Sequence, residues 1–335
     1  VNYQGENVAW ILGDQYRYCK GSGMLGFLPM FHGFGLAMGV HAPLTNYATS
    51  DLMATYNEKE IGKLIKARKL RYLIVVPYLA KRMLKGKTLN NPSVSNLTHA
   101  FIGADKTNPT VFTEFDSIME KNNSKCRLLE GYGLTETVTV VVVNRIFDRK
   151  PGSVGKPFPD VKLKVIDENG NSLSTNQNGQ ICISAPCLAL GYLNDKEATD
   201  KTFVTDENGI RWVLTGDEGY IDEDGFLFIK GRIKDMFKIA GFNIFPADIE
   251  DMTNKIEGVE NCAAVYIDNP NHPYVHLFIK SDSKNIDTSE LVKRVREILS
   301  NELIKYAVPE KITVIDNLPL TNVGKIDKKK LIELD

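Results

Sequence analysis

The segment Glu130–Thr137, with the sequence EGYGLTET, combines residue types that suit a nucleotide site. It follows the apolar run Cys126–Leu129, which predicts a short strand, and α/β sheets bind ligands at the carboxyl ends of their strands. Its two glycines let a ligand approach the backbone, and Tyr132 offers an aromatic face. Thr135 supplies a hydroxyl group, and Glu136 a carboxylate able to bind a hard cation such as Mg²⁺. A surface turn that contains Gly-x-Gly explains the spacing about equally well.

Asp217 and Arg232 form a second candidate pair, because each lies at the end of a predicted strand. A carboxylate accepts hydrogen bonds and a guanidinium donates them, so together they suit the diol of a ribose. A structural ion pair across a hairpin is an equally good explanation. Lys325 lies on a predicted polar turn, where a solvated lysine is the commoner explanation.

Composition narrows the class of protein. The 335 residues include 41 Lys plus Arg and 42 Asp plus Glu, a formal net charge of −1 that argues against a strongly basic nucleic-acid binder. The length predicts about two domains, and no apolar run approaches the roughly 18–20 residues of a membrane span. The five cysteines include no Cys-x-x-Cys pair, which is typical of a reducing compartment. We therefore expect a cytoplasmic protein with no nucleic-acid partner and no membrane span.

Helical and strand patterns alternate over the first 145 residues, which predicts βαβ units and a parallel sheet. The expected elements are a helix over Asn57–Leu70, a strand over Tyr72–Val76, a helix over Tyr78–Leu84, a strand over His99–Gly103, a helix over Val111–Lys121, the strand Cys126–Leu129 and a further apolar segment, Val138–Asn144.

Short strands separated by turn residues follow, over Val161–Ile166, Gln180–Ser184, Trp212–Leu214, Gly219–Ile221 and Phe226–Ile229. Asn169-Gly170 and Asp224-Gly225 are strong hairpin dipeptides, because glycine accepts the positive φ of a tight turn. This pattern predicts a small antiparallel β subdomain.

A third pattern begins after Arg232. The expected elements are a helix over Pro246–Asn254, strands over Cys262–Asp268 and Val275–Lys280, a helix over Ser289–Tyr306 with Asp287 or Thr288 as its cap, and a strand over Lys311–Ile315. The fold class is therefore α/β and α+β multidomain. We place an α/β part at 1–150, an antiparallel β subdomain at 151–232 and a small α+β C-terminal domain at 233–335.

Taken in order, the motifs of the chain resemble the adenylate-forming superfamily of acyl-CoA synthetases, firefly-type luciferases and peptide-synthetase adenylation domains. The residues that carry the resemblance are Leu28–Gly33, Gly131–Glu136, Gly179–Thr199, Thr215–Asp217, Gly231–Gly241 and Pro319–Lys325. The match spans essentially the whole chain, and six motifs in the family order are very specific. The chain is most like an acyl-CoA synthetase of the long-chain fatty-acid–CoA ligase type.

The resemblance implies a two-step ligase that uses ATP, Mg²⁺ and coenzyme A. A carboxylate attacks the α-phosphate of ATP to give an acyl-adenylate and pyrophosphate, and the thiol of coenzyme A then displaces AMP. By position, the resemblance assigns nucleotide binding to Gly103, Ala104, Asp105, Gly131, Tyr132, Gly133 and Ile229, ribose contacts to Asp217 and Arg232, a phosphate contact to Thr135 and the Mg²⁺ ligand to Glu136.

The resemblance also implies roles for the small domain. Lys325 would be the mobile lysine that bridges carboxylate and α-phosphate oxygens, and both reactants are anions, so its charge is worth roughly 3–4 kcal/mol. Lys234 would be the hinge about which the domain rotates between the two half-reactions. Lys238 would act in the thioester step, and Gly241 would line the coenzyme A channel.

The chain departs from the family pattern in two places. The Ser/Thr/Gly-rich phosphate loop that normally precedes Phe31-His32 is absent, with most of the large domain's first half, so we expect a truncated chain that does not adenylate alone. Amino-acid-activating members have Phe-Asp where this chain has Phe31-His32, and a histidine cannot hold a substrate ammonium group. We therefore expect His32 and Gly33 to line a pocket for an apolar acyl chain such as a fatty acid. The alternatives are a ligase that loads an acyl or amino-acyl group onto a carrier-protein phosphopantetheine, and a non-catalytic nucleotide-binding module.

Overall fold

The chain forms two compact units, each with its own hydrophobic core. The computed structural model describes residues 3, 7, 22–68, 70–86, 88–239, 242–269, 272–282, 287–321 and 325–335. The first unit consists of Val1–Thr215 and Gly219–Ile229, and the second of Gly216–Glu218 and Lys230–Asp335. The strands expected to form a subdomain over 151–232 contribute Ile181, Ile183 and Val213 to the core of the first unit.

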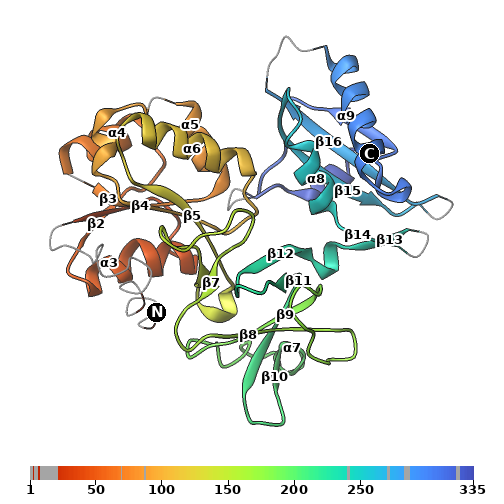
Figure 1. Cartoon of the computed structure of the whole chain (residues 1–335), viewed down its shortest axis with the longest axis horizontal. Helices are drawn as coiled ribbons and strands as arrows, with labels where there is room; N and C mark the ends of the chain where they lie inside the picture. Colours follow the sequence, from red (N-terminus) through yellow and green to blue (C-terminus); the bar gives the residue numbers. More distant parts are fainter. Residues whose placement is uncertain are drawn as a thin grey trace. The chain divides into compact units, whose positions relative to one another are not determined.

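A seven-stranded sheet with the order β2-β1-β3-β4-β5-β6-β7 forms the centre of the first unit (Figure 1). Its strands are β1 (Gly23–Gly26), β2 (Thr49–Leu52), β3 (Leu70–Val75), β4 (His99–Ile102), β5 (Arg127–Gly133), β6 (Val140–Val143) and β7 (Lys156–Pro157). The predicted parallel sheet is present in β3, β4 and β5, and β1 and β2, which were not predicted, extend it in parallel. At the other edge, β6 and β7 add antiparallel strands.

Helices cover both faces of this sheet (Figure 1). On one face lie α4 (Glu58–Arg68), α5 (Pro77–Lys85) and α6 (Pro109–Lys121), and on the other lie the π-helix η2 (Phe34–His41) and α3 (Ala42–Thr45). Asn108 begins α6, because its side chain accepts a hydrogen bond from the backbone N–H of Thr110 and proline fills the first helical position. Among the helices described, none is long and apolar enough to cross a bilayer.

A second sheet has the order β10-β11-β9-β8, and β12 also pairs with β11. Its strands are β8 (Lys162–Ile166), β9 (Gly179–Ser184), β10 (Phe203–Thr205), β11 (Arg211–Ile221) and β12 (Leu227–Arg232). The pairs β8–β9 and β10–β11 are antiparallel, in agreement with the antiparallel β region predicted here. At the two predicted hairpin dipeptides, Gly170 and Gly225 adopt φ of 85° and 82°.

Two features of this region differ from the prediction. The strands expected over Trp212–Leu214 and Gly219–Ile221 are one strand, β11, which accommodates Gly216 at φ 68°. The helix α7 (Lys196–Thr202) was not predicted, because none of its residues is buried and it therefore lacks an apolar stripe. Asp195 begins α7 by accepting a hydrogen bond from the backbone N–H of Ala198.

The second unit contains a three-stranded sheet, β15-β16-β17, and a two-stranded one, β13-β14 (Figure 1). Its elements are the 3₁₀ turn η5 (Ile233–Asp235), β13 (Phe237–Ile239), β14 (Phe242–Ile244), α8 (Pro246–Thr253), β15 (Val259–Ile267), β16 (Tyr274–Ser281), α9 (Thr288–Glu302), β17 (Lys311–Val314) and α10 (Lys328–Ile332). Asp287 caps α9, one of the two caps predicted, but α9 ends at Glu302, short of the expected Tyr306.

Successive residues of β15 face opposite sides of the sheet, as the pleat of a strand requires. Cys262 and Ala264 join the core formed with α8 and α9, which includes Ile249 and Val295. Ala263 and its alternate neighbour Val265 pack instead with Leu318 and Leu331, so α10 covers the other face. The second unit is therefore a sheet with helices on both sides.

Candidate functional site

Two of the predicted nucleotide-binding segments are neighbours in space. Gly103-Ala104-Asp105 follows β4, and Gly131-Tyr132-Gly133 ends β5, the strand that pairs in parallel with β4. A Cβ on Gly103 would lie 3.0 Å from the carbonyl oxygen of Gly131, so the two backbones are nearly in contact there. Both segments thus lie at the carboxyl ends of strands, where ligands bind in α/β sheets.

The boundary of β5 corrects one prediction. The sequence pattern ends the strand at Leu129, before the glycine segment, whereas β5 continues to Gly133. The continuation depends on pairing with β6, in which Gly131 lies opposite Val143 and Tyr132 opposite Val142. A Cβ on Gly133 would lie 1.9 Å from the carbonyl oxygen of Thr139, so glycine is required for this close approach.

A 3₁₀ turn, η4 (Thr135–Thr137), follows β5 and carries the other two candidates. The buried Thr137 hydroxyl accepts a hydrogen bond from the backbone N–H of Leu134 at 2.9 Å and donates one to the carbonyl of Thr139 at 2.8 Å. Val138 then adopts φ 69° and ψ −53°, a strained conformation for a β-branched residue. The turn is thereby fixed, with Thr135 exposed and Glu136 half-buried.

The predicted acyl-pocket residues lie against this turn. A Cβ on Gly33 would be 1.7 Å from the carbonyl oxygen of Val138, so the two backbones are in direct contact. His32 accepts a hydrogen bond at Nδ1 from the backbone N–H of Phe34, 3.2 Å away, at the start of η2. The structure therefore brings Gly33, with His32 beside it in the chain, against Val138, the residue that directly follows the turn of Thr135 and Glu136.

A segment that the sequence analysis did not single out as a site also contacts the turn. The backbone N–H of Ala189 donates to the carbonyl of Glu136 at 2.7 Å, and the Tyr192 hydroxyl donates to the Glu136 carboxylate. Burial and the hydrogen bond to Glu136 raise the pKa of Tyr192, so the phenol stays protonated and able to donate. Both residues belong to the family motif Gly179–Thr199, but no spacing in that motif indicates a contact with Glu136.

The donor set at Glu136 fits a Mg²⁺ ion that binds together with a nucleotide. The described residues include no group of three or more His, Cys, Asp or Glu that would hold a metal ion. Mg²⁺ is usually bound through one or two carboxylates together with substrate phosphates and water. The single half-buried carboxylate of Glu136, next to the Thr135 hydroxyl, suits that mode of binding.

Asp217 and Arg232 belong to the second compact unit and form an ion pair. Arg232 Nε lies 2.9 Å from Asp217 Oδ1, and the Asp217 side chain is 6% exposed whereas that of Arg232 is 44% exposed. The ion pair that we considered as the structural alternative is therefore present, and ribose binding by the pair stays a prediction. Ile229, also predicted to bind the nucleotide, is partly buried against the core of the first unit.

The predicted lysines all lie in the second unit. Lys325 is exposed, and its backbone is held by Thr321, which donates its N–H to the Lys325 carbonyl at 2.7 Å and accepts the Lys325 N–H at 3.2 Å. Lys234 lies within η5, and Lys238 lies in β13 with an exposed side chain. Gly241, the predicted coenzyme A contact, lies outside the described residues.

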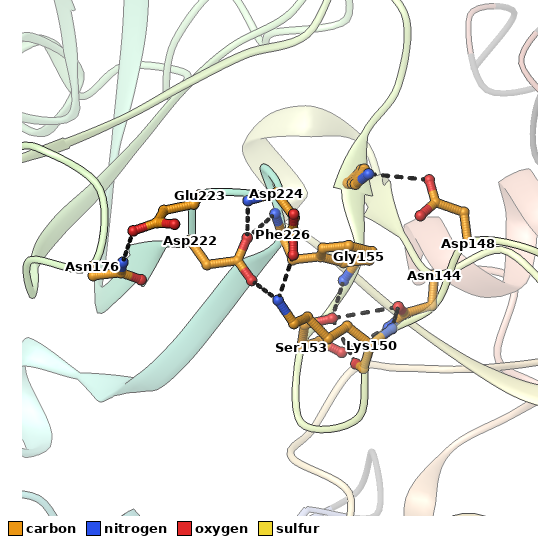
Figure 2. A network of polar contacts seen from close by, with 11 residues as sticks. Asn144, Asp148, Lys150, Ser153, Gly155, Asn176, Asp222, Glu223, Asp224 and Phe226 are labelled. Carbon is orange, nitrogen blue, oxygen red and sulfur yellow. Dashed lines mark hydrogen bonds and ion pairs between the residues drawn. The ribbon is translucent and has the colours of Figure 1, made fainter.

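A polar network around Asn144 and Lys150 (Figure 2) is joined to β5 at Glu130. Asn144 donates its backbone N–H to the Glu130 carbonyl at 2.9 Å and its side-chain amide to the Ser153 carbonyl at 2.7 Å. Lys150 donates to Asp222 at 2.5 Å and to Asp224 at 2.8 Å (Figure 2), and this pairing raises the pKa of Lys150. The network therefore joins the strand that carries the glycine segment to the turn before β12.

Comparison with known families matches most of the chain to two family models. Residues 4–193 match the family model of the AMP-binding enzymes, and residues 248–325 match that of the AMP-binding enzyme C-terminal domain. The chain therefore belongs to the AMP-binding enzyme family, and the resemblance drawn from its motifs is confirmed.

Individual relatives and solved structures agree with this assignment. The chain is 38% identical over 206 residues to a long-chain-fatty-acid–CoA ligase of Escherichia coli O157:H7, which covers 61% of this chain and 35% of that protein. It is 28% identical over 328 residues to luciferin 4-monooxygenase of Luciola mingrelica, covering 97% of this chain and 57% of that protein. Its structure resembles ATP-bound MatB from Rhodopseudomonas palustris with a TM-score of 0.86 at 25% identity, over 99% of this chain and 63% of that one. The chain thus spans only part of the length of each.

Proposed function

We propose that the chain forms part of a ligase that activates a carboxylate as an acyl-adenylate and then transfers the acyl group to coenzyme A. One observation carries the proposal: the fixed turn Thr135–Thr137 carries a hydroxyl and a half-buried carboxylate just after β5, and the next residue, Val138, is in backbone contact with Gly33. Membership of the AMP-binding enzyme family supports it.

In the first step of this reaction, a carboxylate oxygen of the substrate attacks the α-phosphorus of ATP, and the bond to pyrophosphate breaks. Thr135 would donate its hydroxyl hydrogen to a phosphate oxygen, and Glu136 would hold Mg²⁺, which would supply positive charge to neutralise the phosphates. Lys325 offsets the negative charge shared by the carboxylate and the α-phosphate, a contribution of roughly 3–4 kcal/mol. In the second step, the thiol sulfur of coenzyme A attacks the acyl carbon, the bond from that carbon to the phosphate oxygen of AMP breaks, and the thiol proton is released to solvent. We assign Lys238 a role in this step.

The substrate that we propose is a fatty acid. The residues beside Gly33 form the helix η2, which contains no Asp, Glu, Lys or Arg and in which Phe34, Ala37 and Met38 are buried. His32 has no carboxylate to hold an ammonium group, so the site favours an apolar acyl chain over an amino acid. The named relatives differ in what they act on, a long-chain fatty acid in one and luciferin in the other, so the proposal rests on these residues.

Pyrophosphate exchange over a panel of carboxylic acids tests the proposal, in a form of the protein that also carries the phosphate loop. We expect exchange to be highest with fatty acids, weaker with aromatic acids and absent with amino acids. Exchange that is strongest with amino acids would contradict the assignment of the substrate. Thioester formation with coenzyme A and with a phosphopantetheinylated carrier protein, measured side by side, then identifies the acceptor.

The 335 residues alone should bind AMP weakly and produce no pyrophosphate from ATP and a fatty acid, because the phosphate loop is absent. A burst of pyrophosphate from the purified chain would contradict this expectation. The matched positive control is the same chain joined to the phosphate-loop segment of a related ligase.

A further inference from the structure

The Glu136 carboxylate is held by a segment far away in the sequence. Tyr192 lies 56 residues after Glu136, and its hydroxyl donates a hydrogen bond to Oε1 of the carboxylate. Within the described residues, this contact leaves the second oxygen, Oε2, without a hydrogen-bond donor. The same segment also holds the backbone of the turn, since Ala189 donates its N–H to the Glu136 carbonyl at 2.7 Å.

The segment Cys187–Tyr192 is itself anchored on its other side. The Arg211 guanidinium donates to the carbonyl of Ala189 at 2.6 Å and to that of Leu190 at 2.8 Å. The backbone N–H of Tyr192 donates to the Thr199 hydroxyl of α7 at 2.8 Å. Tyr192 therefore reaches Glu136 from a backbone that two further side chains fix in place.

The position of the phenol matters because a single carboxylate is a weak and adaptable cation ligand. A carboxylate that accepts a hydrogen bond on one oxygen loses rotational freedom and presents its other oxygen in one orientation. Residues that hold a ligand in this way commonly contribute 10- to 100-fold to metal affinity. A tyrosine hydroxyl suits the role, since it is a donor that carries no charge of its own at neutral pH.

We propose that Tyr192 is a positioning residue for the metal-bound nucleotide: its hydroxyl fixes Glu136 so that Oε2 binds the divalent cation that accompanies ATP. The inference rests on the proposed function, because it takes Glu136 as the residue that binds the cation. The segment Cys187–Tyr192 then contributes indirectly to nucleotide binding, and so does Arg211, which anchors this segment.

The test measures the affinity for ATP of a chain that carries the phosphate loop, by isothermal titration calorimetry, once with Mn²⁺ and once with EDTA and no metal. The variants are Tyr192→Phe, Glu136→Gln and the control Tyr220→Phe. Tyr220 is a half-buried tyrosine that stacks on Phe228 with ring centroids 4.8 Å apart and does not contact Glu136. ATP without metal serves as the internal control for folding, because a damaged fold weakens both affinities.

We expect Tyr192→Phe to weaken the binding of Mn²⁺·ATP by about tenfold and to leave that of metal-free ATP unchanged. Glu136→Gln should weaken Mn²⁺·ATP at least as much, and Tyr220→Phe should have no effect. If Glu136→Gln weakens Mn²⁺·ATP but Tyr192→Phe does not, or tightens it, the inference fails and the proposed function stands. If the chain shows no metal-dependent affinity, or Glu136→Gln leaves it unchanged, the assignment of the cation to Glu136 fails and the inference with it. Equal weakening with and without metal assigns Tyr192 a purely structural role and overturns the inference.

Discussion

Two short loops carry the charged groups on which the proposed reaction depends, and they are held very differently. In the first unit, the turn Thr135–Thr137 is fixed by Ala189, Tyr192 and the backbone contact between Gly33 and Val138. In the second unit, Lys325 is exposed, and the contacts described for it are backbone hydrogen bonds to Thr321. Residues of its own unit fix the Glu136 carboxylate, whereas the Lys325 side chain is exposed and the described contacts hold only its backbone. We therefore expect Glu136 to act throughout the reaction and Lys325 in one step.

The largest expected effect is that of removing the side chain of Lys325. Lys325→Ala, in a chain that carries the phosphate loop, should slow adenylate formation by about 10²–10³-fold, because it removes a donor at a developing charge. It should leave thioester formation from pre-made acyl-adenylate nearly unchanged. Lys238→Ala should slow thioester formation and leave adenylate formation nearly unchanged. Single-turnover rates of each half-reaction measure both.

Lys329→Ala is the matched control, since Lys329 is an exposed lysine of α10 close to Lys325 in the sequence. It should change neither rate and should move the free energy of unfolding by no more than about 0.5 kcal/mol. If Lys325→Ala slows both half-reactions equally, Lys325 does not act in one step only, and the contrast with the fixed Glu136 carboxylate is wrong.

The next largest effect concerns the rigidity of the first loop. Gly33→Ala should destabilise the chain by about 2–3 kcal/mol, because the added Cβ would lie 1.7 Å from the Val138 carbonyl oxygen and the backbone must shift. Gly62→Ala is the matched control: Gly62 lies in α4 with open space at its Cβ position, so alanine should stabilise by about 0.5–1 kcal/mol. Urea denaturation of both variants measures the difference, and similar stabilities would show that Gly33 does not constrain the turn.

The same contrast between local and distant contacts explains how much of the molecule the sequence predicts. The parallel strands β3, β4 and β5 follow from apolar runs separated by helical stripes, and their pairing brings Gly103 next to Gly131. The Asp287 cap likewise depends on local residues.

Contacts between distant segments escaped prediction. The extension of β5 to Gly133 requires pairing with β6, because glycine has little intrinsic preference for strands. The hydrogen bond from Tyr192 to Glu136 depends on the tertiary fold, since 56 residues separate the two side chains. The candidate nucleotide segments were thus accessible from sequence, whereas the residues that fix Glu136 were not.

A smaller effect tests whether movement at Lys234 distinguishes the two half-reactions. Lys234 occupies the 3₁₀ turn η5, whose φ of about −50° to −70° a proline accepts, so Lys234→Pro should hold this conformation and hinder others. We expect one half-reaction to slow about tenfold more than the other. Lys234→Ala, which removes the side chain without restricting the backbone, is the control. Equal slowing of both half-reactions without loss of thermal stability would place the hinge at another residue.

The smallest expected effect concerns another fixed contact of the first unit, the one between Asp222 and Lys150. Asp222 accepts hydrogen bonds from Lys150 and from the backbone N–H groups of Asp224 and Phe226 (Figure 2). Asp222→Asn turns an amide donor toward the Lys150 ammonium group and should cost about 1 kcal/mol of unfolding free energy at pH 7. Asp224→Asn is the control, because the Asp224 side chain is 68% exposed and its ion pair with Lys150 should contribute little.

The loss of unfolding free energy caused by Asp222→Asn should depend on pH, and the pKa of Asp222 gives the direction of that dependence. Burial alone would raise the pKa of Asp222, but the hydrogen bonds from Lys150 and Phe226 outweigh it and lower the pKa below its ordinary value. A carboxylate with a lowered pKa in the folded state stabilises above its unfolded pKa, about 3.9, and loses that contribution as the pH falls through the folded value. The gap in unfolding free energy between the wild-type chain and Asp222→Asn should therefore be constant from pH 5 to 7 and shrink below about pH 4. A gap that stays constant down to pH 3 would mean that the pKa of Asp222 is not lowered in the folded state and that its charge contributes nothing.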